Sequence, residues 1–294
     1  MADDNAGVWA LALAGLGVLV LSMKKSPPLT RKDSILNPDV YPTTLQQWQH
    51  QADTYGLDGA VWIGIVPGNG AVDGQHRHGA RSTIIYFPRT FNRNRPFELI
   101  FFFHGLNGYQ TTDRIGSQLR EMEAQDRNFI FVAPEMPWSH HTLTPGNRQG
   151  SAFAGTQEEN MVTFYNNVLG ILKNQFGVSI KVNKITMIGH SAGGATLRGI
   201  ARSGAMDQIK PDLIVFSDAG YGYWTDQTWD NYAARDQSRW VFLVREGDKP
   251  HRYSMRFLKR FGQTPSNISM TVYPRGSWTH KRIGDSSMIT SHGL

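Results

Sequence analysis

The sequence predicts an α/β domain built on a mostly parallel β-sheet, and two patterns carry that prediction. After Gly59, eight short runs of apolar, β-branched or aromatic residues recur along the chain, bounded by Gly, Pro, Asp or other polar residues. Runs that are apolar at successive positions are typical of strands buried on both faces. Segments with helical spacing of their apolar residues lie between several of these runs. This alternation predicts a doubly wound sheet with helices on both faces.

We expect the eight strands at residues 60–66, 83–88, 97–103, 128–133, 183–189, 212–217, 240–245 and 268–273. The expected helices cover 113–125, 157–176, 192–203 and 252–261. In the second of these, Phe164, Val168 and Leu172 recur every four residues, which places them on one helix face. These elements predict one domain over residues 59–294, with its site at the carboxyl ends of the strands.

The N-terminal 27 residues have a different composition. No residue from 6 to 23 is charged, and these 18 positions reach about 27 Å as a helix, enough to span the hydrocarbon core of a bilayer. Asp3 and Asp4 precede the apolar run, whereas a secretory signal begins with basic residues. We therefore expect an uncleaved membrane anchor in residues 1–27 that enters the bilayer through residues 7–23. A buried helix and an atypical signal peptide remain as alternatives.

Charge and composition extend this interpretation to the segments that follow the anchor. Lys24 and Lys25 directly follow the apolar run, so the positive-inside tendency predicts a single-pass protein with its main domain on the cytoplasmic side. Residues 28–58 are polar and rich in Pro and Gln. We interpret them as a linker followed by an N-terminal extension.

Composition and motifs exclude several classes of site. The chain has no cysteine, which rules out a disulfide scaffold, thiolate metal ligation and a cysteine nucleophile. The sequence has no HExxH, P-loop or GxGxxG motif, and no acidic cluster accompanies the histidines at 76, 78, 140 and 141. We therefore expect neither a metal nor a cofactor. The net charge of +6 favours anionic surroundings, but no nucleic-acid-binding module is recognisable, so no nucleic-acid partner is expected.

The residues Gly189-His190-Ser191-Ala192-Gly193 form the central motif of the chain. An expected strand runs directly into Ser191, and an expected helix leaves it. A serine on such a strand-to-helix turn, a nucleophile elbow, is forced outward at strained dihedral angles, and the flanking glycines permit the turn. Ser191 is therefore the candidate nucleophile. The Ala192 N–H at the helix start is a candidate oxyanion donor.

A second loop supplies the other candidate oxyanion donor. The strand at 97–103 runs into His104-Gly105-Leu106. In enzymes with a serine on such a strand-to-helix turn, the loop after this strand provides a second backbone N–H for the oxyanion. We assign this role to the Leu106 N–H. His104 is expected to shape the loop by hydrogen bonding and not to act as a base.

A serine nucleophile needs a carboxylate that orients its base, and two aspartates follow late strands. Asp248 lies in the loop after the strand at 240–245 and is the first candidate. Asp218 ends the strand at 212–217 and is the alternative acid. Glu246 is less suitable, because its side chain would have to reach back past Gly247.

The base is expected after the last strand. His280 follows the strand at 268–273 and occupies that position. His251 opens an expected helix and His292 lies in the C-terminal tail, so both are weaker candidates.

The order of the strand–HG loop, the GHSAGG elbow, the REGD loop and the late histidine resembles the α/β-hydrolase superfamily across residues 60–294. The resemblance implies a Ser191–Asp248–His280 triad that acts through an acyl-enzyme. Within the superfamily the chain is similar to esterases, to feruloyl- or acetylxylan-esterase-like enzymes and to polyhydroxyalkanoate-depolymerase-like enzymes. Peptidases share the same apparatus.

Two aromatic segments are candidates for substrate binding. Trp138 lies in the loop after the strand at 128–133, and Tyr221 and Trp224 follow the strand at 212–217. Aromatic rings at this edge suit stacking on a sugar, although burial is as good an explanation. We expect a serine hydrolase that cleaves an ester in a small molecule, a polysaccharide or an envelope polymer. The alternatives are a peptidase or amidase with the same triad, and a non-catalytic membrane- or virion-associated binding module.

Overall fold

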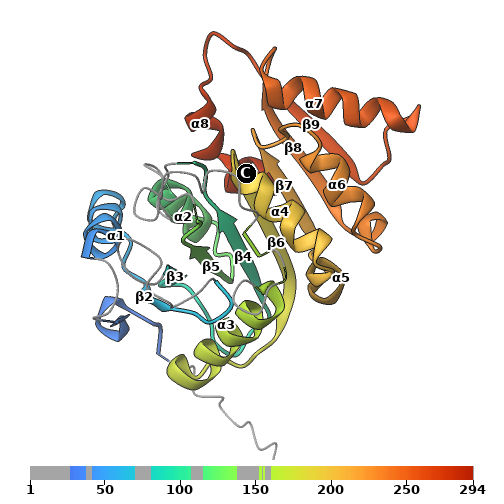
Figure 1. Ribbon diagram of the computed structural model, residues 1–294. Helices are drawn as coiled ribbons and strands as arrows, with labels where there is room; N and C mark the ends of the chain where they lie inside the picture. Colours follow the sequence, from blue (N-terminus) through green and yellow to red (C-terminus); the bar gives the residue numbers. More distant parts are fainter. Residues whose placement is uncertain are drawn as a thin grey trace, which may run out of the picture.

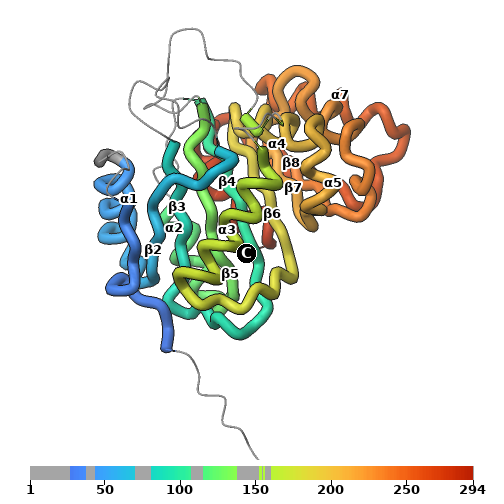
Figure 2. Tube along the Cα trace, turned by 60° about the horizontal axis from the view of Figure 1, so that its bottom comes forward, coloured from blue at the N-terminus to red at the C-terminus, as the bar shows by residue number. Residues whose placement is uncertain are grey.

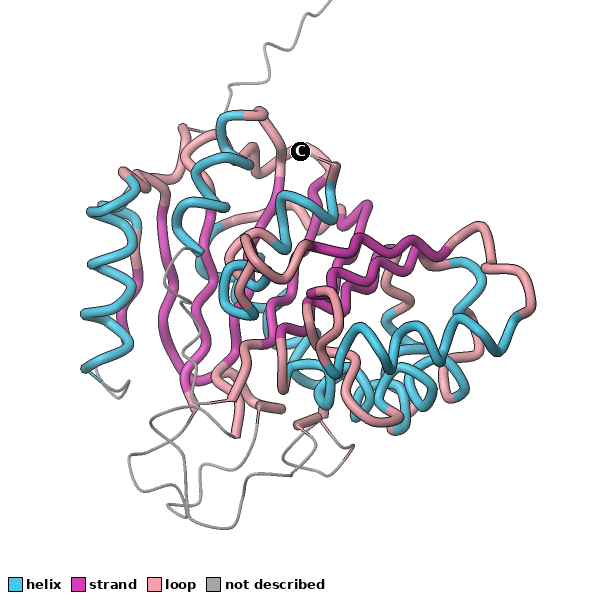
Figure 3. Tube along the Cα trace, turned by 90° about the horizontal axis from the view of Figure 1, so that it is seen from above, coloured by secondary structure: helices cyan, strands magenta, loops and turns pink. Residues whose placement is uncertain are grey.

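A computed structural model describes residues 27–37, 42–69, 81–106, 115–137, 152–153, 155 and 160–293. The described residues form a β-sheet with helices on both of its faces (Figure 1). Helix α1 lies at one end of the sheet, whereas α6 and α7 lie with β8 and β9 at the other end (Figures 1 and 2). Figure 3 shows the same arrangement from above, with strands and helices separated by colour.

The sheet contains nine described strands in the spatial order β1-β2-β3-β5-β4-β6-β7-β8-β9. Strand β3 runs antiparallel to its neighbours β2 and β5, and the other neighbouring pairs are parallel. The strand bounds are β1 Ile35–Leu36, β2 Ala60–Ile65, β3 Ser82–Phe87, β4 Phe97–Phe103, β5 Phe129–Pro134, β6 Val182–His190, β7 Leu213–Ser217, β8 Arg239–Arg245 and β9 Ile268–Tyr273.

The described helices divide between the two faces of the sheet. Helices α3, α4, α5, α6 and α7 contribute to one hydrophobic core, and α1, α2, α8 and α9 contribute to the other. Their bounds are α1 Pro42–Tyr55, α2 Ile115–Ala124, α3 Met161–Phe176, α4 Gly193–Arg202, α5 Ala205–Ile209, α6 Trp224–Asp230, α7 Lys249–Leu258, α8 His280–Gly284 and α9 Ser287–His292.

The period-two geometry of strands produces these two cores from continuous apolar runs. In β4, Phe101 and Phe103 face one core, whereas Ile100 and Phe102 face the other. All seven residues of this central strand are buried. The long helix α3 is preceded by Asn160, whose side-chain oxygen accepts hydrogen bonds from the first turn, as an N-cap residue does.

The predicted α/β class with a mostly parallel sheet is confirmed, and each of the eight expected strands is present as β2 to β9. Their ends differ from the expected ones by no more than one residue. The four expected helices correspond to α2, α3, α4 and α7. The two-residue strand β1 and the short helices α5, α6, α8 and α9 were not expected.

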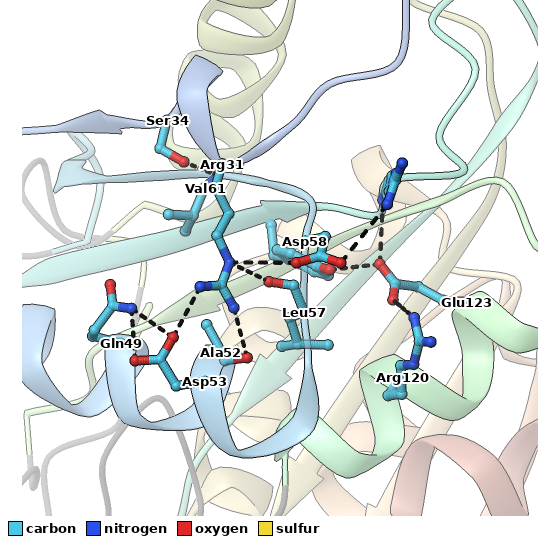
Figure 4. Close-up of polar contacts among 12 residues, drawn as sticks. Arg31, Ser34, Gln49, Ala52, Asp53, Leu57, Asp58, Val61, Arg120 and Glu123 are labelled. Atoms are coloured by element: carbon cyan, nitrogen blue, oxygen red, sulfur yellow. Dashed lines mark hydrogen bonds and ion pairs between the residues drawn. The ribbon is translucent and has the colours of Figure 1, made fainter.

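The N-terminal segment is part of the domain, which corrects its interpretation as a linker and extension. Strand β1 pairs with β2, and Trp48 and Ala52 of α1 are buried in the second core. The Arg31 guanidinium donates hydrogen bonds to the backbone oxygens of Leu57 and Ala52 (Figure 4). These contacts fasten the segment to the sheet, so the folded unit begins before residue 59.

Within the described part of the chain, no helix combines the length and apolar character needed to cross a bilayer. The anchor expected at residues 7–23 lies outside the described residues.

Candidate active site

Ser191 occupies the strand-to-helix turn that the sequence predicts. It follows the last residue of β6 and precedes α4, and its backbone φ is +54°. A non-glycine residue in this left-handed region costs about 1–2 kcal/mol, so the surrounding structure must hold it there. A backbone hydrogen bond of 3.1 Å from Ser191 N to the carbonyl of Ser217 in β7 does so.

Glycines provide the space that this turn needs. A Cβ atom on Gly193 would lie 2.1 Å from the carbonyl oxygen of Phe103, and a Cβ atom on Gly105 would lie 2.8 Å from the Cβ atom of Ser191. Real contacts of that length do not occur, so both positions require glycine. The loop after β4 therefore lies directly against the Ser191 side chain.

His280 is the first residue of α8, and its ring binds a carboxylate. His280 Nδ1 lies 2.5 Å from Asp218 Oδ2. An ionised carboxylate only accepts hydrogen bonds, so Nδ1 carries the proton and Nε2 is left as the basic nitrogen. The Asp218 side chain is 1% exposed and also accepts a hydrogen bond of 3.4 Å from the Arg245 backbone N–H.

The preference for Asp248 as the partner of His280 is corrected by this geometry. The Asp248 carboxylate binds the Arg245 guanidinium, with both Nε and Nη2 at 2.6 Å from Oδ2. Asp248 is the N-cap residue of α7, one strand farther from Ser191 than Asp218. Asp218, the alternative acid of the sequence analysis, is the carboxylate in contact with His280.

Two side chains bring the Ser191 and His280 regions together. The ring of His190, the residue before Ser191, lies 4.8 Å from that of His280 between centroids. His190 Nε2 also lies 3.2 Å from the His280 carbonyl oxygen. The Tyr221 side chain lies close to that of Ser191, and its ring lies 6.5 Å from that of His280.

Burial sets the charge state of these two neighbours. Desolvation, with a further contribution from His280, lowers the pKa of His190 to about 3, so this imidazole is neutral. Since its Nε2 donates to a carbonyl, His190 Nδ1 is an unprotonated acceptor, and it is buried without a hydrogen-bond partner among the described residues. Burial, together with the nearby Asp218 charge, raises the pKa of Tyr221 to about 12, which keeps its hydroxyl protonated. The sequence analysis assigned no role to His190, although it lies inside the central motif.

The two predicted oxyanion donors belong to segments that meet at Ser191. Ala192 precedes the first turn of α4, where backbone N–H groups have no partner within the helix. Leu106 follows the loop that touches Ser191, and it is 45% exposed. His104 is fully buried: its Nδ1 lies 2.8 Å from the Gly105 oxygen, and its Nε2 accepts a hydrogen bond from Met136 N. It shapes this loop, as the sequence predicts.

The remaining candidates for the base and the acid lie away from the site. His251 Nδ1 accepts a hydrogen bond from the Gly247 N–H at the start of α7, and His292 Nε2 binds the buried carboxylate of Glu98. Glu246 is exposed in the loop after β8. Neither histidine touches Asp218 or Ser191 among the contacts of the described residues.

The predicted aromatic residues divide between described and undescribed parts of the chain. Trp224 begins α6 and packs against Tyr221, with ring centroids 5.6 Å apart. Both rings therefore lie beside the site, and their role in binding substrate remains a prediction. Trp138 lies outside the described residues.

Among the described residues, no group of three or more His, Cys, Asp or Glu side chains gathers in a way that could hold a metal ion. The histidines at 76, 78, 140 and 141 lie outside the described residues.

Comparison with known proteins identifies the fold. A ferulic acid esterase matches with a TM-score of 0.52 at 12% sequence identity, over 78% of this chain and 95% of its own. A structure described as FAE matches with a TM-score of 0.49 at 13% identity, over 78% and 94% of the two chains. A cold-adapted esterase from an Arctic intertidal metagenomic library has a TM-score of 0.48 at 12% identity, over 75% and 89%. No family model and no curated protein matches the sequence. The resemblance seen in the motifs is thus confirmed at the level of the fold, which is α/β-hydrolase-like.

Proposed function

We propose that the protein is a serine hydrolase that cleaves an ester through an acyl-enzyme on Ser191. The observation that carries the proposal is the pairing of His280 with the buried Asp218 carboxylate, next to the ring of His190, which immediately precedes a serine held at a positive φ. A hydroxyl, an imidazole and a carboxylate in this relation are the parts that activate a serine nucleophile.

In the first half-reaction, His280 Nε2 takes the proton from Ser191 Oγ as the oxygen attacks the ester carbonyl. The resulting oxyanion is stabilised by the N–H groups of Ala192 and Leu106. His280 then gives its proton to the oxygen of the departing alcohol, and the acyl group stays on Ser191. In the second half-reaction, His280 activates a water molecule that releases the acid.

Asp218 holds the ring of His280 in the productive tautomer and stabilises the imidazolium that forms in each step. The neutral state of His190 suits this role, because a charged imidazole 4.8 Å away would oppose the protonation of His280. The Tyr221 hydroxyl lies close to Ser191 and stays protonated, so it is a potential donor beside the nucleophile.

The test uses the full-length chain and an uncharged fluorophosphonate probe, with the label located by peptide mass. We expect labelling at Ser191 that is absent in Ser191→Ala and strongly reduced in His280→Ala. A panel of acetyl, feruloyl, longer acyl and peptide substrates then separates an esterase from an amidase. A folded protein that is not labelled would instead support the non-catalytic binding module.

We also propose that residues 7–23 anchor this domain in a membrane, with the domain on the cytoplasmic side. The uncharged stretch followed by Lys24 and Lys25 supports the proposal. Retention of the full-length chain in membrane pellets after alkaline washing is the expected result. Release into the supernatant would contradict it.

A further inference from the structure

The proposed base is carried by a short element at the surface. Helix α8 has five residues, and of these only Ile283 and Gly284 are buried. The residues directly before it, 274–279, are exposed or half-buried. A helix of little more than one turn has little stability of its own, so the position of His280 depends on contacts between α8 and the rest of the domain.

One side chain, that of His190, contacts α8 at both of its ends. His190 Nε2 lies 3.2 Å from the carbonyl oxygen of His280, and the two rings lie 4.8 Å apart between centroids at an interplanar angle of 31°. At the other end of the helix, a Cβ atom on Gly284 would lie 2.7 Å from three atoms of the His190 ring. The glycine four residues after the base therefore lets α8 pack directly against this imidazole.

His190 is itself fixed by the central sheet. It is the last residue of β6, it is 8% exposed, and it pairs in register with Ser217 of β7. Its Nδ1 also faces the loop after β4, since a Cβ atom on Gly105 would lie 3.5 Å from it. His190 thus connects α8 both to Ser191, which follows it directly, and to the loop that carries the Leu106 N–H.

Both the donor and the ring of this imidazole make contacts. A carbonyl oxygen only accepts hydrogen bonds, so Nε2 carries the proton that binds the His280 carbonyl. The flat ring contacts the His280 ring and Gly284. An aliphatic side chain would supply neither contact, and a phenyl ring would supply no donor.

We propose that His190 is a positioning residue for the hydrolysis: through the carbonyl and the ring of His280, it holds the base in a fixed position relative to Ser191. This inference rests on the proposed ester hydrolysis. His190 is buried and transfers no proton itself, so its loss affects the proton transfers made by His280 more than the binding of substrate. A displacement of about 1 Å in a catalytic group can cost about 10²-fold in rate.

Gly284→Ala tests the contact without changing His190 or any reacting group. The added methyl group would lie 2.7 Å from the ring, so the ring or α8 must move. With the full-length protein, we expect kcat/KM for a neutral ester to fall about 10- to 100-fold. The matched control is Gly170→Ala in α3, where a Cβ atom would meet no other described atom within 4 Å. This control should keep the parent activity.

The contact also predicts that two exchanges are not additive. His190→Ala removes the ring and the donor, and it should lower kcat/KM by a similar factor. In that background the methyl group of Gly284→Ala has free space, so the second exchange should cost less than about 2-fold. Equal effects of Gly284→Ala with and without the His190 ring would overturn the inference.

A comparison of leaving groups separates positioning from a loss of folded protein. We would measure kcat/KM for 4-nitrophenyl, phenyl and benzyl acetate, whose alcohols depend increasingly on a proton from His280 as they leave. In Gly284→Ala and in His190→Phe, which keeps a ring without a donor, the loss should grow along this series, while KM changes little. His190→Gln restores an N–H donor and should recover part of the loss.

The control for stability is His292→Ala, which removes a buried histidine at the carboxylate of Glu98. It should leave the ratios among the three esters unchanged. Turnover by the parent with a uniform loss for all three esters in the His190 and Gly284 variants overturns the inference and leaves the proposed function standing. Absence of both turnover and labelling of Ser191 in the parent refutes the proposed function instead.

Discussion

Exchange of Asp218 for Asn is the sharpest test of the site, because the structure and the sequence pattern favour different acids. The Asp218 carboxylate is 1% exposed and lies 2.5 Å from His280 Nδ1. An amide has the same shape but no charge, and its N–H group can hold the ring in the wrong tautomer. Loss of the orienting carboxylate in a serine triad costs about 10⁴ in kcat, and we expect a loss of about 10³ to 10⁴ for Asp218→Asn.

Asp248→Asn is the matched control. It removes an ion pair with Arg245 whose side chains are 25% and 18% exposed, an interaction worth about 0.2–1 kcal/mol at such positions. We therefore expect kcat/KM to change by less than about 3-fold, with at most a small loss in the free energy of unfolding.

The assay is the second-order rate constant for fluorophosphonate labelling together with kcat/KM for a neutral ester, each measured for both variants. Urea unfolding establishes that the variants are folded. If Asp248→Asn is the more damaging exchange while both proteins remain stable, the assignment of Asp218 is refuted. Equal and small effects would refute the triad itself.

Three further predictions concern the surroundings of the site. Tyr221→Phe removes a hydroxyl that lies close to Ser191, and we expect kcat/KM to fall about 2- to 10-fold; an unchanged value would show that this hydroxyl does not assist the nucleophile. Burial lowers the pKa of His190 to about 3 in the folded protein, whereas the pKa in the unfolded chain is near 6.5. Below pH 6.5 the unfolded chain therefore binds a proton that the folded protein does not, and the free energy of unfolding falls by about 1.4 kcal/mol per pH unit on acidification toward pH 3. Above pH 6.5 this loss is absent. Urea unfolding between pH 6.5 and 4.5 should show a shallower pH dependence for His190→Phe than for the parent, and identical slopes would contradict the prediction. His292→Ala leaves the buried carboxylate of Glu98 without one partner, so we expect a loss of about 1–3 kcal/mol in unfolding free energy, and full stability of the variant would count against this.

The strands were predictable because their signal is local. A run such as Phe97–Phe103 is apolar at nearly every position, and a central strand covered by helices on both faces requires that pattern. The turn at Ser191 was predictable for the same reason, since the strand, the glycines and the helix are contiguous in sequence.

The N-terminal helix was missed because its apolar signal is sparse. Helix α1 has Thr, Gln and His at most positions and buries mainly Trp48 and Ala52 against the sheet. Its place is fixed by contacts with distant residues, such as the hydrogen bonds from Arg31 to the backbone of Ala52 and Leu57. Tertiary contacts of this kind leave little trace in a local window.

Which aspartate contacts His280 depends on how the loop after β7 and the loop before α8 meet in space. The spacing of residues along the chain does not predict that contact. One local signal was present: Arg245 lies three residues before Asp248 and offers it a partner, whereas no basic residue lies near Asp218 in sequence. An aspartate that ends a buried strand without such a partner must find one elsewhere. In the structure that partner is His280.

The sheet order gives a physical reason for the pairing with Asp218. Strand β7 is the immediate neighbour of β6, about 4.8 Å away, whereas β8 is about twice as far. Asp218 has a φ of +46°, and its N–H bonds the Leu243 carbonyl at 2.7 Å, so the chain turns sharply at the end of β7. Nucleophile and acid thus share one feature: each is a strained residue at a strand end whose backbone N–H donates a hydrogen bond to a carbonyl of the next strand. Because the energetic cost of this backbone strain is met when the protein folds, Ser191 and Asp218 are already in position. Neither side chain has to reorganise as charge develops on His280.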